Sequence, residues 1–150
     1  MAENVRVGLI GAGANTLLRH IPGFQAIDGV DVVAVANRTE ESAQRVADQH
    51  HIPTVHQHWT DVVDDLDIDA VCIGTWPYMH STITLAALEA GKHVMTEARM
   101  AMNAAEAHQM YAASQAHPEL VAQIVPSPFG LRIHQVVQDL LQERLSLIHI

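Results

Sequence analysis

Apolar positions along this chain fall into two kinds of segment: short continuous runs, and longer stretches with apolar residues at helical spacing. The short runs predict buried strands over Val5–Ile10, Asp31–Asn37, Asp69–Gly74, Lys92–Thr96 and Leu120–Val125, and an edge strand over Pro53–Val55. The longer stretches predict helices over Ala14–Ile27, Thr39–Gln49, Trp59–Asp65, Pro77–Ala90, Asn103–Ala116 and Leu131–Arg144. Strands separated by helices need crossover connections, so the pattern predicts an α/β fold with a doubly wound, mostly parallel sheet and helices on both faces.

Capping and breaking residues support these boundaries. Thr39 has the chemistry of an N-cap, and Asn103 is followed by Glu106 at capping-box spacing. Gly91 stands where a helix C′ residue is expected. The Pro22–Gly23 pair predicts a kink in the first helix, or two short helices in its place.

The first strand ends in a glycine turn that leads directly into a helical pattern. A strand, a glycine turn and a helix N-terminus together present backbone N–H groups to a pyrophosphate. Gly11 permits the tight turn, and Gly13 lets phosphates approach the backbone because it has no Cβ. Thr16 occupies the third position of the G-x-G-x-x-G/A fingerprint, where a smaller residue usually allows close helix packing. The sequence therefore predicts a Rossmann-type dinucleotide site at the Gly11 and Gly13 turn.

The end of the second strand predicts which dinucleotide is bound. A site for NAD usually has an acidic residue there, about 20 residues beyond the glycines, which binds the ribose 2′-hydroxyl. This chain has Asn37, Arg38 and Thr39 instead. A guanidinium can pair with a 2′-phosphate, which a carboxylate would repel. We therefore expect NADP, with NAD as the alternative; Arg38 could otherwise pair simply with Glu41.

Charge and composition exclude several other classes. The formal net charge is −9, which argues against nucleic-acid binding because phosphate neutralisation needs clustered Lys and Arg. Cys72 is the single cysteine and lies in an apolar run, so we expect a buried, inert thiol. No apolar run approaches 18 residues, and we expect a cytoplasmic protein without a membrane partner. Four histidines lie close together in the sequence but lack the spacing of metal ligands: His50, His51, His56 and His58. We therefore expect no metal site.

Two further motifs carry a family resemblance. The first is Gly74-Thr75-Trp76-Pro77-Tyr78-Met79-His80, and the second runs Ala87-Leu88-Glu89-Ala90-Gly91-Lys92-His93-Val94 and leads to Glu97. Together with the glycine turn, they resemble the T-P-x-x-x-H, A-L-x-A-G-K-H-V and E-K-P pattern of the glucose–fructose oxidoreductase, inositol dehydrogenase and rhizopine catabolism (Gfo/Idh/MocA) family. The resemblance covers Val5 to about Phe129. It implies an NAD(P)-dependent oxidoreductase that transfers a hydride to or from a hydroxyl-bearing carbon of a sugar, cyclitol or related metabolite.

The resemblance also implies roles for particular residues. The pyrophosphate would be lined by Gly11, Gly13, Ala14, Asn15 and Thr16. Thr75, Trp76 and His80 would lie beside the nicotinamide half of the cofactor, and Glu97 beside the nicotinamide ribose. The family's Lys of E-K-P, which is thought to assist proton transfer at the substrate, is replaced by Ala98. The catalytic acid/base residue is therefore unknown. Arg99 is a candidate for anchoring an anionic substrate or an oxyanion, and a solvated or phosphate-pairing arginine is the alternative.

The loss of the lysine leaves a second function open: a dinucleotide-sensing or regulatory protein without catalysis. In either case we expect a small-molecule ligand, and a homo-oligomer of the full-length protein remains open.

The chain end suggests a truncated gene. We expect a dinucleotide-binding domain over residues 1–127 and a crossover segment over 128–144 that leads to a missing substrate domain. Residues 145–150 carry no turn, cap or charge pattern and match a translated transposon end, so we expect a non-native tail. The fragment itself is then expected to be inactive.

Overall fold

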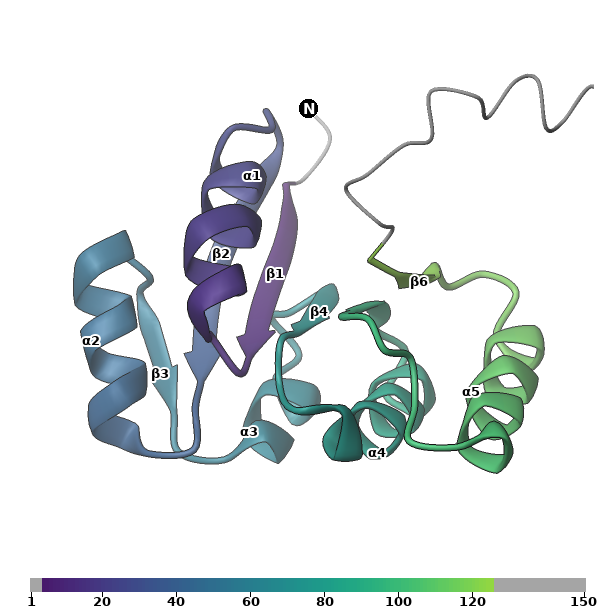
Figure 1. Ribbon diagram of the computed structural model, residues 1–150. Helices are drawn as coiled ribbons and strands as arrows, with labels where there is room; N and C mark the ends of the chain where they lie inside the picture. Colours follow the sequence, from purple (N-terminus) through teal and green to yellow (C-terminus); the bar gives the residue numbers. More distant parts are fainter. Residues whose placement is uncertain (1–3, 126–150) are drawn as a thin grey trace, which may run out of the picture.

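The computed structural model describes residues 4–125, which form one sheet of six parallel strands flanked by helices (Figure 1). The strands are β1 (Val5–Ile10), β2 (Val30–Ala36), β3 (Thr54–His56), β4 (Ala70–Ile73), β5 (His93–Thr96) and β6 (Ala122–Ile124). The helices are η1 (Thr16–His20), α1 (Ile21–Gln25), α2 (Glu40–His50), α3 (Trp59–Asp64), α4 (Pro77–Glu89) and α5 (Ala104–Ala116). The predicted helix over 131–144 and the tail lie outside the described residues.

The strand order is β3-β2-β1-β4-β5-β6, and all five pairings are parallel. This is the order of the doubly wound dinucleotide-binding fold, so the predicted fold class is confirmed. The order reverses between β1 and β4, since the chain moves outward in one direction from β1 and in the other from β4. Ligands of such sheets bind beyond the carboxyl ends of the strands at this reversal.

Two apolar layers fix the helices on opposite faces of the sheet. Leu9 and Val35 point into the layer beneath η1, α1 and α2, whereas Ile10 and Ile73 point into the layer beneath α3 and α4. The alternation of successive strand residues between the two layers is the period of a β-strand. Figure 1 shows α1 and α2 together beside β1–β3, with α4 and α5 beside the other half of the sheet.

The predicted interruption of the first helix takes the form of one widened turn. Helical backbone begins at Ala14 and continues to Gln25, but residues 16–20 form a π-helical turn. The Ile21 N–H donates to the Thr16 carbonyl, five residues back. Pro22, which has no N–H group to donate, directly follows this widened turn, as the second residue of α1.

The predicted caps and stops are confirmed. The Thr39 side chain accepts from the Ser42 N–H at 3.3 Å, and the Asn103 side chain accepts from the Glu106 N–H at 3.0 Å. Gly91 follows α4 with φ +75°, in the left-handed region that favours glycine. Local sequence chemistry therefore determines where α2, α4 and α5 begin or end.

Candidate functional site

The turn after β1 is held in place from both neighbouring strands. Gly11 has φ +85°, and its N–H donates to the Ala36 carbonyl at 2.8 Å. A Cβ on Gly11 would lie 2.8 Å from the Thr75 backbone nitrogen, so only glycine fits between β1 and the end of β4. The Ala12 N–H donates to Asn37 Oδ1 at 2.7 Å, which ties the turn to the end of β2.

Gly13 lies on the opposite, open side of the same turn. A Cβ there would have a single neighbour, the Gly74 carbonyl oxygen at 4.0 Å, and its φ is not in the left-handed region. No contact within residues 4–125 therefore explains the missing side chain. Ala14 and Asn15 follow as exposed residues in the first helical turn, whose N–H groups have no partner within the helix. The turn presents bare backbone and a helix N-terminus to the same space.

Thr16 lies beneath the turn rather than on its open side. Its side chain is buried, and its hydroxyl donates to the Gly11 carbonyl at 3.3 Å. A Cβ on Gly74 would stand 2.3 Å from Thr16 Oγ1 and 2.5 Å from the Gly11 oxygen. The missing side chain of Gly74 thus leaves room for Thr16, which stands at the third fingerprint position, where a smaller residue is usual.

The end of β2 presents a cation and a cap. Asn37 is half-buried and engaged with Ala12, whereas Arg38 and Thr39 are exposed. No hydrogen bond or ion pair among residues 4–125 engages the Arg38 guanidinium, and the expected alternative pair with Glu41 is not among them. A free guanidinium therefore flanks the turn on the β2 side.

The loop after β4 separates into an exposed and a buried part. Thr75 is half-buried beside Gly11, and Trp76 is 74% exposed. His80 is buried: its Nδ1 lies 2.8 Å from the Arg99 carbonyl oxygen and its Nε2 lies 3.0 Å from the Thr75 carbonyl oxygen. The ring joins the loops after β4 and β5, so His80 supports the site without exposing its ring to it.

Ala98 and Arg99 are exposed in the loop after β5. The described hydrogen bonds and ion pairs use the Arg99 carbonyl but not its guanidinium. Arg99 is therefore available as a surface cation, and Ala98 offers no ionisable group.

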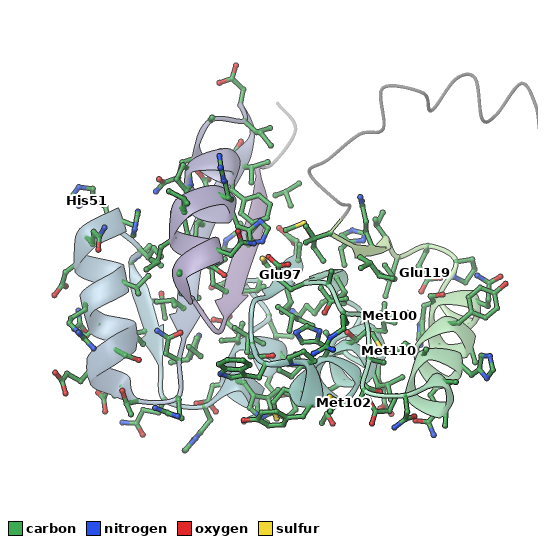
Figure 2. The ribbon with its side chains drawn as sticks, viewed as in Figure 1. His51, Glu97, Met100, Met102, Met110 and Glu119 are labelled. Atoms are coloured by element: carbon green, nitrogen blue, oxygen red, sulfur yellow. The ribbon has the colours of Figure 1, made fainter. Side chains whose placement is uncertain are left out.

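Glu97 is the centre of a polar cluster that motif reasoning only partly identified. Its Oε1 accepts hydrogen bonds from Asn15 Nδ2 and from His20 Nε2, the latter at 2.6 Å. The side chains of His20 and Glu97 are 10% and 17% exposed. Figure 2 shows Glu97 in the middle of the molecule, on the side where the helix after β1 lies. His20 was not predicted, because residues five apart do not share a face of a regular α-helix; the π-helical turn brings it beside Asn15.

The cluster keeps Glu97 ionised. Burial by itself would raise the pKa of this carboxyl, but hydrogen bonds from His20 and Asn15, the charge of His20 and the Ala98 N–H outweigh it, so the pKa is lowered. A carboxylate is an acceptor only. The carboxyl end of β5 therefore offers a fixed acceptor, whereas the carboxyl end of β2 offers a cation.

A buried cysteine and a cavity beside α5 are further features of the described residues. Burial raises the pKa of the Cys72 thiol to about 12, with a further contribution from Glu97, in line with the expected inert cysteine. A cavity of about 310 Å³ lies between α4, α5 and the end of the sheet, where Figure 2 labels Met100 and Met110. The part of the chain that the structure describes has no cluster of metal-ligating side chains, and no helix in it is long and apolar enough to cross a membrane.

These features define a dinucleotide-binding domain of Rossmann type, and sequence comparison gives the family. The profile of the Gfo/Idh/MocA oxidoreductase family, NAD-binding Rossmann fold, matches residues 5–124. The chain therefore belongs to this oxidoreductase family, as its motifs indicated.

Named relatives support the assignment, and they are longer than this chain. The chain is similar to trans-1,2-dihydrobenzene-1,2-diol dehydrogenase of Bos taurus, with 36% identity over 72% of this chain and 31% of the relative. It is 34% identical to an inositol 2-dehydrogenase/D-chiro-inositol 3-dehydrogenase of Shouchella clausii, over 80% of this chain and 35% of that one. A crystal structure of KijD10, a 3-ketoreductase from Actinomadura kijaniata in complex with NADP, superposes with TM-score 0.80 at 26% identity, covering 94% of this chain and 44% of that one. The chain thus spans less than half the length of these relatives.

Proposed function

We propose that this chain is the NADP-binding part of an oxidoreductase that transfers a hydride to or from a hydroxyl-bearing carbon of a sugar, cyclitol or related metabolite. The observation that carries the proposal is the open side of Gly13. A Cβ there would meet only one atom, 4.0 Å away, although the turn around it is tightly packed. A glycine that no protein contact requires is expected where phosphate oxygens approach the backbone.

The strand order supports the following placement of the whole cofactor in this proposal. The pyrophosphate lies at the turn after β1, where N–H groups and the helix dipole favour negative charge. The adenosine half extends over the end of β2, where Arg38 pairs with the 2′-phosphate and Thr39 is adjacent. The nicotinamide half extends over β4 and β5, beside Thr75, Trp76 and Glu97.

The chemistry is then divided between cofactor and protein. The nicotinamide supplies the hydride transfer, and residues of this chain bind and orient it. Names of relatives support the substrate class: one is an inositol dehydrogenase and another a 3-ketoreductase. In this proposal the proton donor or acceptor is a residue other than Ala98 and Arg99, because alanine cannot exchange a proton and a guanidinium stays protonated.

One observation favours a second function. Ala98 stands where the resembling family has its proton-handling lysine, and its loss leaves the cofactor surface intact. A protein that senses the dinucleotide without turning over a substrate is compatible with this. Activity of the Ala98→Lys variant on polyols with NADP, where the unchanged protein has none, would favour sensing by the unchanged protein.

Calorimetric titration of the 150-residue chain with NADPH and NADH tests the proposal. We expect tighter binding of NADPH, and we expect the Arg38→Ala variant to lose roughly 10- to 100-fold for NADPH but little for NADH, since a charged hydrogen-bonded pair contributes about 1.5–3 kcal/mol. Arg45→Ala is the matched control, an exposed arginine further along α2. Equal affinity for both cofactors, or an unchanged ratio in Arg38→Ala, would contradict the NADP assignment.

A further inference from the structure

Asn15, His20 and Glu97 form a link between the helix after the glycine turn and the end of β5. Asn15 and His20 lie five residues apart on that helix, and both contact the same oxygen of Glu97. Asn15 Nδ2 also lies 3.4 Å from His20 Nε2. Because the three side chains contact one another, the direction of the Glu97 carboxylate depends on the helix that presents its N-terminus to the pyrophosphate.

The two oxygens of Glu97 are used unequally. Oε1 has two donors, Asn15 and His20, which match its two lone pairs. Oε2 has one donor within the described residues, the Ala98 N–H at 3.2 Å. Oε2 therefore has room for one further donor, and its orientation is fixed by the contacts that Oε1 makes.

The strand order indicates what that donor is. β5 lies beyond β4 on the side of β1 away from β2, so its carboxyl end lies on the side opposite the adenosine half of a bound dinucleotide. The nearest sugar on that side is the ribose that carries the nicotinamide. Its hydroxyl groups can donate, whereas the carboxylate can only accept.

We propose that His20 is a positioning residue, which holds the Glu97 carboxylate so that Oε2 accepts a hydrogen bond from a hydroxyl of the nicotinamide ribose. This inference rests on the proposed function, and it adds a residue that no motif identified. His20 acts through Glu97 and does not contact the cofactor. Loss of the His20 donor leaves Oε1 with Asn15 as its one described donor, so the carboxylate is held less firmly in this orientation.

Comparing two ligands distinguishes a positioning role of His20 from a purely structural role, because only one of the ligands contains the nicotinamide half. Calorimetric titration of the 150-residue chain with NADP⁺ and with 2′,5′-ADP, which lacks the nicotinamide half, gives both affinities. In His20→Phe, which keeps an aromatic ring beside Phe24, we expect NADP⁺ binding to weaken about tenfold and 2′,5′-ADP binding to stay unchanged. His20→Gln should restore NADP⁺ binding, because the glutamine amide places a donor near the position of Nε2. His20→Leu serves the same test if the phenylalanine variant does not fold.

His93→Leu is the matched control. His93 lies at the opposite end of β5 and accepts from the Val121 N–H, so its loss should not distinguish the two ligands. Equal weakening of both ligands in His20→Phe, or no rescue in His20→Gln, would overturn the inference and leave the proposed function standing. Absence of binding of either ligand to the unchanged chain would overturn the proposed function itself.

The carboxamide of the nicotinamide is the other donor on this half of the cofactor. The 3-acetylpyridine analogue of NADP⁺ lacks its N–H₂ group and keeps the ribose hydroxyls. A His20→Phe penalty of the same size with this analogue supports the ribose contact. Loss of the penalty would overturn that contact.

Discussion

Replacing Gly13 by alanine adds one methyl group, which should weaken cofactor binding without destabilising the fold. The new Cβ would have its nearest described neighbour 4.0 Å away, at the Gly74 carbonyl oxygen, which is ordinary contact. The backbone of Gly13 is not in the left-handed region, so alanine can adopt it. A compatible glycine-to-alanine change stabilises a protein by about 0.4–1 kcal/mol through the unfolded state. We therefore expect the free energy of unfolding to stay level or rise slightly.

The effect on binding should have the opposite sign. If phosphate oxygens approach the bare backbone at Gly13, the methyl group takes their place, and the overpacking costs about 1–3 kcal/mol. That corresponds to roughly 5- to 150-fold weaker NADP⁺ binding. Urea denaturation measures the first quantity and calorimetric titration the second.

Gly74→Ala is the contrasting variant. Its Cβ would lie 2.3 Å from Thr16 Oγ1 and 2.5 Å from the Gly11 carbonyl oxygen, so the turn itself must move and unfolding should become easier. The reasoning fails if Gly13→Ala binds NADP⁺ as well as the unchanged chain. It also fails if the two glycine variants lose the same stability.

Three further outcomes follow from particular contacts. Lys92→Met should lower the free energy of unfolding by about 2–4 kcal/mol, since the buried Lys92 ammonium donates to the carbonyls of Asp65 and Ile68, both at 2.6 Å. Urea denaturation measures this loss, and a loss under about 1 kcal/mol would contradict the prediction. NADPH should quench the fluorescence of the exposed Trp76, and quenching that persists in Trp76→Phe would place the cofactor elsewhere. The pKa of the Glu97 carboxyl is lowered from its ordinary 4.5, so the ionised carboxyl stabilises the fold fully above pH 4.5, and this contribution is lost as the pH falls through the lowered pKa. In Glu97→Gln the thermal midpoint should therefore fall less steeply in acid. An equally steep fall in the variant would contradict the role of Glu97.

Local patterns in the sequence predicted most of the fold. The strand at Val5–Ile10 has the predicted bounds, and the other described strands differ from prediction by one or two residues at an end. Apolar runs and caps act within a few residues, so they can be read without the fold. Crossover rules and the glycine turn together predicted a doubly wound, mostly parallel sheet, because few topologies satisfy both.

The residues of the most specific family motif stabilise the fold and do not line the glycine turn. In Ala87–Val94, Gly91 ends α4, the Lys92 ammonium binds two loop carbonyls, and His93 accepts from the Val121 N–H. All three lie at the amino end of β5, away from the glycine turn. A recurring motif can therefore identify a family while the residues that bind its ligand lie elsewhere.

The parts of the site that sequence could not predict depend on long-range contacts. The motif position of His80 suggested a place at the cofactor, but its ring is buried between two carbonyls that only the fold brings together. Gly74 accommodates Thr16 across 58 residues, and His20 meets Glu97 across 77. No local spacing signals such pairs.

Chemical-shift mapping of the 150-residue chain during titration with NADP⁺ tests the central claim most directly. The account predicts saturable shifts of backbone amides at the turn after β1, at Arg38 and Thr39, and at Thr75 and Glu97, with little change at the amino ends of the strands. Shifts confined to other surfaces, or no saturable shift at the glycine turn, would contradict it.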